Sequence, residues 1–125
     1  MASSFQRGRP ASGPVVQGFA GGGFSVDGQV YPAVLLTPEA AAPWSPPPLA
    51  ELDLSYLQPL LELSPTPEFI LFGSGSSMAF PPRALIRDLE SRGIGLEAMD
   101  SRAAARTWGL LRAEGRWIAA AIMGL

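Results

Sequence analysis

The hydrophobic and polar positions follow their most regular pattern from Glu68 to the end of the chain. Short apolar runs alternate there with longer amphipathic stretches. This alternation predicts strands at Phe69–Phe72, Gly95–Met99 and Trp117–Met123, and helices at Pro81–Ser91 and Ala103–Glu114. A strand–helix–strand–helix–strand order indicates strands that are at least partly parallel, with a crevice at their C-terminal ends. The last apolar run has no polar alternation, which predicts a central strand buried on both faces.

The first third of the chain has the pattern of short antiparallel strands. Val15–Ala20 and Phe24–Val26 are plausible strands on either side of a Gly21–Gly23 turn. Asp27-Gly28 is a strong hairpin signal. Gln29–Thr37 then predicts one further strand, in which Pro32 indicates an edge or a bulge. This part is therefore expected to form an antiparallel meander.

A proline-rich segment, Pro38–Leu49, joins the two halves and contains Trp44. Pro43–Pro46 fits a P-x-x-P ligand pattern, but a rigid surface connection with Trp44 anchored on the core is the favoured interpretation. Asp53 or Ser55 is expected to cap a short helix over Tyr56–Leu63.

The last helix is expected to bury Ala104, Trp108 and Leu111, with Leu110 beside that stripe. Gly109 lies inside the same helix, where glycine costs roughly 1 kcal/mol relative to alanine. Its presence predicts that another element packs close to it. The chain as a whole is expected to be α/β, with a flexible leader over residues 1–13 and a single domain over residues 14–125.

The composition limits the chemistry that this chain can perform. It contains no His and no Cys, and all nine basic residues are Arg. These absences remove the usual general base, the thiolate nucleophile, zinc–cysteine sites and the Walker lysine. We therefore expect no catalytic residue, no metal site and no cofactor, and we favour binding over catalysis. The net charge of −2 gives no support for nucleic-acid binding, and no apolar stretch is long enough to span a membrane.

The candidate site lies where the crossover rule places two loops on one edge of the sheet. Its polar and glycine residues are Gly73, Ser74, Gly75, Ser76, Ser77, Asp100 and Ser101. Backbone amides of a glycine loop and a helix N-terminus can hold an anion, but a dinucleotide fingerprint is only partly met because Met78 stands at the third glycine position. Three interpretations of these residues remain open. They are a purely structural glycine turn with an Asp/Ser helix cap, a site for a small ligand or anion, and a nucleotide site. At the opposite edge, Arg116 is expected to pair with Glu114 or with the sheet edge.

Three runs of residues resemble a small family of unknown molecular activity. They are Phe72–Gly75, Met99–Thr107 and Glu114–Ala121, and the resemblance extends over roughly residues 14–123. The family includes the mitochondrial complex I assembly factor 3 and the adipogenesis-associated protein. Thr107, which closes the second run, is counted with the crevice. The chain departs from the family pattern at Trp108-Gly109, where members usually have an aromatic residue and then Asn.

The resemblance implies a three-layer α/β fold with a mixed central sheet and an added β-hairpin layer. It implies no established activity, cofactor or catalytic residue. It suggests a protein partner, namely respiratory complex I or its assembly machinery, and a location in the bacterial cytoplasm or at the membrane periphery, or in the mitochondrion for a eukaryotic member. An interaction protein acting through its surface and a small-molecule-binding or enzymatic domain using the Gly73–Asp100 crevice remain the two alternatives.

Overall fold

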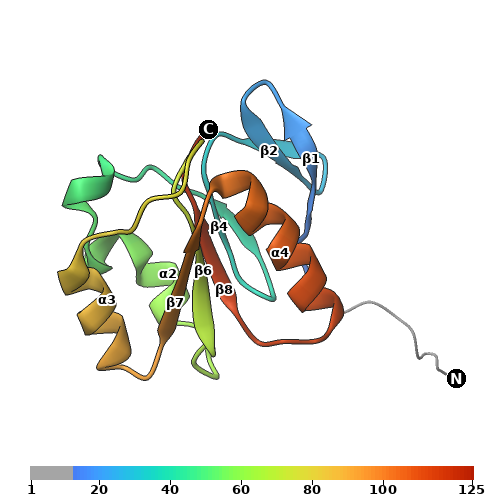
Figure 1. Ribbon diagram of the computed structural model, residues 1–125. Coiled ribbons are helices and arrows are strands. Elements are labelled where there is room, and N and C mark those ends of the chain that lie inside the picture. The colour runs from blue at the N-terminus through green and yellow to red at the C-terminus, as the bar shows by residue number, and fades with distance from the viewer. Residues whose placement is uncertain (1–12) are drawn as a thin grey trace, which may run out of the picture.

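The computed structural model describes residues 13–125, and its centre is a five-stranded mixed sheet (Figure 1). Its strands, in the order β5-β4-β8-β6-β7, are β5 (Ala41–Pro43), β4 (Val34–Leu36), β8 (Ala119–Ile122), β6 (Phe69–Gly73) and β7 (Gly95–Met99). β6 pairs in parallel with β7 and β8, whereas β4 pairs antiparallel with β5 and β8. The predicted interior position of the last strand is confirmed, although the strand begins at Ala119 and not at Trp117. Apart from Gly13, the expected leader lies outside the described residues.

A second, three-stranded antiparallel sheet precedes the central one. It consists of β1 (Val16–Ala20), β2 (Gly23–Val26) and β3 (Gln29–Tyr31), in the order β1-β2-β3. The meander is therefore confirmed, but the prediction of one strand over Gln29–Thr37 is wrong. The chain leaves the small sheet at Pro32, which has no N–H to donate to a strand ladder. β4 then begins two residues later and joins the central sheet instead.

The helices are α2 (Gln58–Leu61), α3 (Arg83–Glu90) and α4 (Ser101–Ala113), and two 3₁₀ turns, η1 (Leu49–Glu51) and η2 (Leu54–Leu57), precede α2. The expected helix over Tyr56–Leu63 is thus divided into η2 and a single α-helical turn. Asp53 caps η2 by accepting a 2.9 Å hydrogen bond from the Ser55 N–H. Pro59 lies in the first turn of α2, where its missing N–H costs no helical hydrogen bond.

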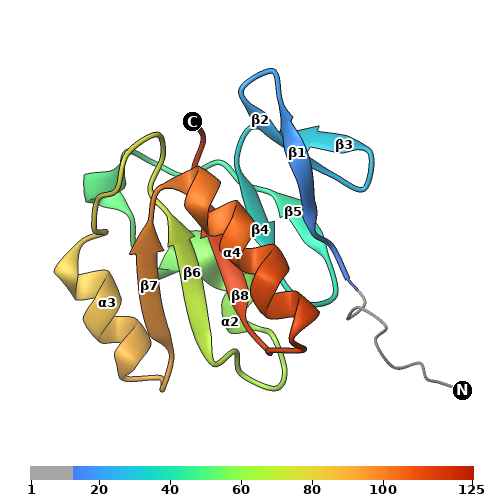
Figure 2. The ribbon, with the colours of Figure 1, turned by 45° about the vertical axis from the view of Figure 1, so that its right-hand side comes forward.

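The central sheet separates two hydrophobic cores, because its strands point alternate side chains to opposite faces. On β8, Ala119 and Ala121 face the core under α2 and α3, whereas Ala120 and Ile122 face the core under α4 and the small sheet. Figure 2 shows α4 in front of the sheet with the small sheet beside it. The arrangement is the three-layer α/β fold with a mixed central sheet.

Trp44 ties the proline-rich segment to the core. Its side chain is buried, and its indole N–H donates a 2.9 Å hydrogen bond to the Tyr56 carbonyl. The segment thus includes the edge strand β5 and holds Trp44 inside, as the favoured interpretation required.

Two details of α4 differ from the sequence prediction. A Cβ atom added at Gly109 would have no atom within 4 Å of it beyond the neighbouring backbone of α4, so no other element packs closely there. Leu110, expected beside the buried stripe, is 68% exposed. Ala104 and Trp108 are fully buried, as predicted.

Candidate functional site

The glycine loop after β6 lies directly against the N-terminus of α4. The Gly75 N–H donates to Ser101 Oγ at 2.8 Å, and the Ser101 N–H donates to the Gly75 carbonyl at 2.8 Å. Ser101 is completely buried. The two segments that the crossover rule placed on one edge of the sheet are therefore in contact.

The hydroxyl of Ser101 also reaches the end of the last strand. It donates to the Met123 carbonyl at 2.7 Å, and the Met123 N–H donates to the Gly73 carbonyl at 2.9 Å. A single serine thus connects the C-terminal end of β6, the start of α4 and the C-terminal end of β8. These hydrogen bonds satisfy buried polar groups that would otherwise destabilise the fold.

Ser74 organises the rest of the loop. Its N–H donates to the Met99 carbonyl at 2.9 Å, and its hydroxyl lies 2.8 Å from the Ser77 carbonyl. The same hydroxyl accepts a 2.9 Å hydrogen bond from the Ala79 N–H. The loop is thereby closed on itself and fastened to the end of β7.

Gly73 is required by the close approach of α4 to β6. A Cβ atom there would lie 2.9 Å from Ser101 Oγ and 2.9 Å from Ile122 Cγ2. Gly75 has a φ of +110°, which other residues rarely adopt. Close packing at Gly73 and the positive φ of Gly75 therefore give each of these glycines a structural reason.

Asp100 is the N-cap of α4. Its Oδ1 accepts a 2.9 Å hydrogen bond from the Ala103 N–H. A carboxylate at this position satisfies an orphan donor of the first turn and interacts favourably with the helix dipole.

These bonds determine what remains available for a ligand. The amides of Ser74, Gly75 and Ser101 all donate within the protein, whereas Ser76 and Ser77 are exposed on the outside of the loop. Thr107 is not brought to this group, because it lies roughly 10 Å further along the axis of α4 than Asp100. Ligand binding by the crevice residues stays a prediction.

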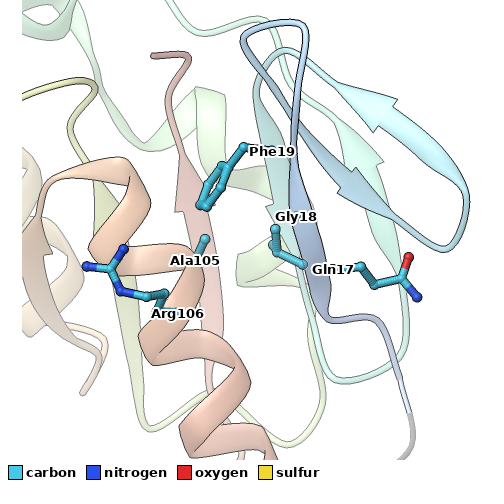
Figure 3. A pocket seen from close by; sticks show the side chains of 6 residues that line it. Gln17, Gly18, Phe19, Ala105 and Arg106 are labelled. Carbon is cyan, nitrogen blue, oxygen red and sulfur yellow. The ribbon is translucent and has the colours of Figure 1, made fainter.

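The surface hollows of residues 13–125 include two that lie away from these hydrogen bonds. The smaller, about 190 Å³, lies between β1 and α4 and is lined by Val16, Gln17, Gly18, Phe19, Ala105 and Arg106. In Figure 3 the Phe19 ring points toward α4, and the Arg106 side chain extends away from β1. The Arg102 guanidinium lies 5.4 Å from the centre of the Phe19 ring and borders the same region.

The larger hollow, about 400 Å³, lies at the start of α3 and is lined by Phe80, Pro81, Arg83 and Ile86. Phe80 is 67% exposed beside it. These residues were not predicted as a site from the sequence. The available signal was the presence of Met78 and Phe80, two large apolar residues in a loop between Ser77 and Pro81.

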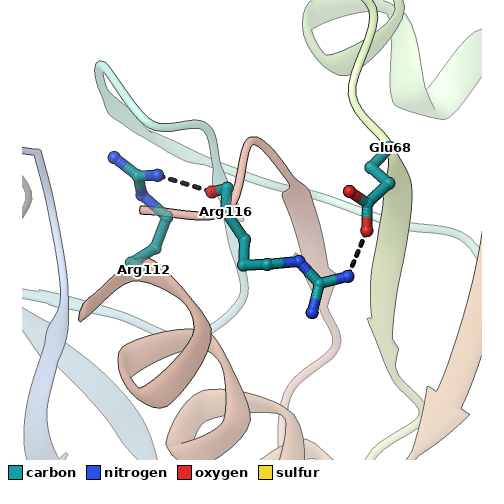
Figure 4. Close-up of polar contacts among 3 residues, drawn as sticks. All are labelled: Glu68, Arg112 and Arg116. Atoms are coloured by element: carbon teal, nitrogen blue, oxygen red, sulfur yellow. Dashed lines mark hydrogen bonds and ion pairs between the residues drawn. The ribbon is translucent and has the colours of Figure 1, made fainter. Parts of the chain in front are cut away.

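Arg116 has a structural position at the opposite edge of the sheet. Its guanidinium pairs with Glu68, the residue before β6 (Figure 4). The guanidinium also lies 5.5 Å from the centre of the Phe69 ring. The partner is therefore Glu68 and not Glu114. The hydrogen bond and the charge of Glu68 raise the pKa of Arg116, and the charge of Glu114 adds to this effect.

Arg112 is buried in the same region. Its Nη1 donates a 2.5 Å hydrogen bond to the Arg116 carbonyl, which Figure 4 also shows. Together Arg112 and Arg116 fasten the turn between α4 and β8, so neither is expected to act on a substrate.

Among residues 13–125, no group of three or more His, Cys, Asp or Glu residues is placed to hold a metal ion. Within the same residues, no helix has both the length and the apolar character needed to cross a membrane.

Comparison with known families gives one match that covers most of the chain. Residues 16–123 match a family described as a protein of unknown function (DUF498/DUF598). The chain belongs to this family.

Solved structures of similar proteins share its fold. A crystal structure of a Bordetella parapertussis protein has a TM-score of 0.81 and 33% sequence identity, and the match covers 93% of this chain and all of the other.

A second solved relative, from Bordetella pertussis, is described as a Mth938-like domain. It has a TM-score of 0.74 and 28% identity, with 88% of this chain and 85% of that chain covered. An uncharacterised Rhodobacter capsulatus protein is 31% identical over 86% of this chain and 82% of its own length. A Danio rerio protein named NADH dehydrogenase [ubiquinone] 1 alpha subcomplex assembly factor 3 is 25% identical over 90% of this chain and 66% of its own length.

Proposed function

We propose that this protein binds a partner protein during the assembly of respiratory complex I and does not act by catalysis. The observation that carries the proposal is the Danio rerio relative, which is named as an assembly factor of NADH dehydrogenase and matches 90% of this chain. The proposal treats residues 14–125 as one domain that acts through its surface. We place it in the bacterial cytoplasm, in contact with the membrane only through its partner.

The residues available in the chain favour binding in the same way. There is no His, Cys or Lys to act as a base or a nucleophile, and Arg is a poor proton-transfer group because it stays protonated at ordinary pH. The polar groups of the Gly73–Asp100 crevice hold the strand ends together. A protein that works by surface contacts needs neither a reactive side chain nor an open crevice.

The test is deletion of the gene in its own organism. We expect the amount of assembled NADH dehydrogenase, measured on native gels and by NADH oxidation in membranes, to fall while its subunit transcripts stay unchanged. The wild-type gene supplied on a plasmid should restore it. A normal level of assembled enzyme in the deletion strain, or turnover of a small substrate that depends on Asp100, would show that the proposal is wrong.

A further inference from the structure

The loop between the glycine turn and α3 exposes two large apolar side chains. Met78 is 48% exposed and Phe80 is 67% exposed. Phe80 borders the hollow of about 400 Å³ at the start of α3, and Pro81 and Ile86 form the rest of its apolar lining. Sites that bind ligands usually have volumes of roughly 300–1,000 Å³ and mostly apolar walls. The hollow therefore has the size and the lining to receive an apolar side chain from another molecule.

One face of α3 carries two arginines, Arg83 in the first turn beside the hollow and Arg87 in the last turn. Arg83 lines the hollow, and Arg87 follows four residues later, so the two exposed side chains lie on one face of the helix. The structure gives neither of them an ion pair within residues 13–125. Of the two acids of α3, Asp88 is rotated away from this face, whereas Glu90 lies on it, one turn beyond Arg87 and away from the hollow.

We propose that the hollow at the start of α3 is a docking site for an acidic segment of a partner protein. One apolar side chain of that segment fills the hollow beside Phe80, and flanking carboxylates bind Arg83 and Arg87. Arg is suited to this role because its planar guanidinium binds a carboxylate through two parallel hydrogen bonds. The inference rests on the proposed function, since it specifies the chemistry of the partner that an assembly factor would bind.

Two other occupants fit these observations less well. A second copy of this chain would meet the first through the same patch on both molecules, as in an ordinary two-fold dimer. That contact would bring Arg83 and Arg87 against the same two arginines. A membrane surface would contact Phe80 and both arginines, but a flat surface leaves a hollow beside them unfilled.

The first experiment uses a library of random twelve-residue peptides displayed on phage and selected on the purified chain. We expect the enriched peptides to contain Asp or Glu on both sides of a Leu, Phe or Trp. A synthetic copy of an enriched peptide, labelled with a fluorophore, is then titrated with each variant and followed by fluorescence anisotropy. Enrichment of neutral or basic peptides instead would overturn the proposal.

The chain offers matched controls for both parts of the site. Phe80→Ala and the double variant Arg83→Glu/Arg87→Glu are each expected to weaken peptide binding at least tenfold. Leu110→Ala removes an equally exposed apolar side chain from α4, and Arg102→Glu/Arg106→Glu reverses an exposed pair with the same spacing. Both controls should leave the affinity within twofold. The proposal would be overturned if the control variants lost as much peptide affinity as the site variants, or if Phe80→Ala lost none.

The other occupants have their own measurements. Wild-type protein and Phe80→Ala are sedimented with phosphatidylcholine vesicles that contain or lack one quarter phosphatidylserine, and both are also examined by sedimentation velocity. We expect no vesicle binding and a monomer. Binding to the anionic vesicles that requires Phe80, or a dimer that Phe80→Ala dissociates, would replace the acidic peptide as the occupant.

Complementation of the deletion strain separates this inference from the proposed function. If the wild-type gene restores assembled NADH dehydrogenase and the Phe80→Ala and Arg83→Glu/Arg87→Glu genes restore it equally well, the docking site is wrong and the function stands. If deletion leaves assembled enzyme normal, the function is wrong, and the peptide titrations alone decide whether the docking site exists.

Discussion

Ser101 and Gly75 hold each other through two hydrogen bonds of opposite direction, each 2.8 Å long. Because the Ser101 hydroxyl also donates to the Met123 carbonyl at 2.7 Å, one small side chain joins the ends of β6 and β8. The residues that look like a ligand-binding loop in the sequence thereby fasten the C-terminal edge of the central sheet.

Ser101→Ala is therefore expected to destabilise the protein. The Gly75 N–H and the Met123 carbonyl would lose their partner in a buried environment, which costs about 1–3 kcal/mol. The free energy of unfolding, measured by urea denaturation, should fall by that amount.

Ser91→Ala is the matched control, because the Ser91 hydroxyl donates a 2.7 Å hydrogen bond to the Asp88 carbonyl on the exposed end of α3. Water can replace the hydroxyl at this exposed position, so the free energy of unfolding of Ser91→Ala should differ from that of the wild type by no more than about 0.5 kcal/mol. An equal decrease in the free energy of unfolding of Ser101→Ala and Ser91→Ala would mean that the burial of Ser101 has no special role.

Asp100→Ala tests the cap of α4 and the crevice together. Loss of the carboxylate that accepts from the Ala103 N–H should cost about 1 kcal/mol, and Asp100→Asn should cost much less because the amide oxygen can still accept. Both are measured by the same urea denaturation.

The crevice itself is tested by adding inorganic phosphate, and separately AMP, to ¹⁵N-labelled protein. Because the amides of Gly75 and Ser101 already have internal partners, we expect their chemical shifts to stay constant. Saturable shifts at Gly73–Ser77 that disappear in a folded Asp100→Ala variant would establish a ligand site there and favour the alternative function.

Much of the fold is encoded in short patterns that act locally. The unbroken apolar run that contains β8 could be placed in the sheet interior because only a strand covered on both faces tolerates it. Asp27-Gly28 fixed the hairpin between β2 and β3, since both residues adopt the positive φ that this turn needs. The contact between Gly75 and Ser101 followed from the handedness of the crossover connections.

Other features depend on long-range packing that no local pattern contains. The break at Pro32 sends β4 to the central sheet because β8 offers it a partner nearly ninety residues later in the chain. The exposure of Phe80 cannot be read from its apolar character, since Phe is among the residue types that are most often buried. The direction of the Ser101 hydroxyl, which decides how the candidate crevice is filled, is visible only in the structure.

Gly109→Ala should stabilise the protein by about 1 kcal/mol, because alanine is the better helix former and no atom beyond the neighbouring backbone of α4 lies within 4 Å of the new Cβ. Gly73→Ala should have the opposite effect, because its Cβ would lie 2.9 Å from both Ser101 Oγ and Ile122 Cγ2. Thermal unfolding should show a higher midpoint temperature than the wild type for Gly109→Ala and a lower one for Gly73→Ala. A destabilised Gly109→Ala would restore the expectation that another element packs against this helix.

Trp108 and Trp44 anchor distant segments in the same way on opposite faces of the sheet. The Trp108 indole N–H donates to the Pro14 carbonyl at 2.8 Å, and the Trp44 indole N–H donates to the Tyr56 carbonyl at 2.9 Å. Trp108→Phe removes the first bond and leaves a buried carbonyl unsatisfied, so the residues of β1 should open more easily.

Amide hydrogen exchange measures this effect residue by residue. In Trp108→Phe we expect faster exchange in β1 and β2, with the amides around η2 little changed beyond the global loss of stability. Trp44→Phe should show the reverse pattern, because its hydrogen bond fastens η2 and not the small sheet. Acceleration of the same amides in both variants would mean that neither indole hydrogen bond acts locally, and that other contacts, among them that of Arg102 with the Phe19 ring, hold the small sheet to α4.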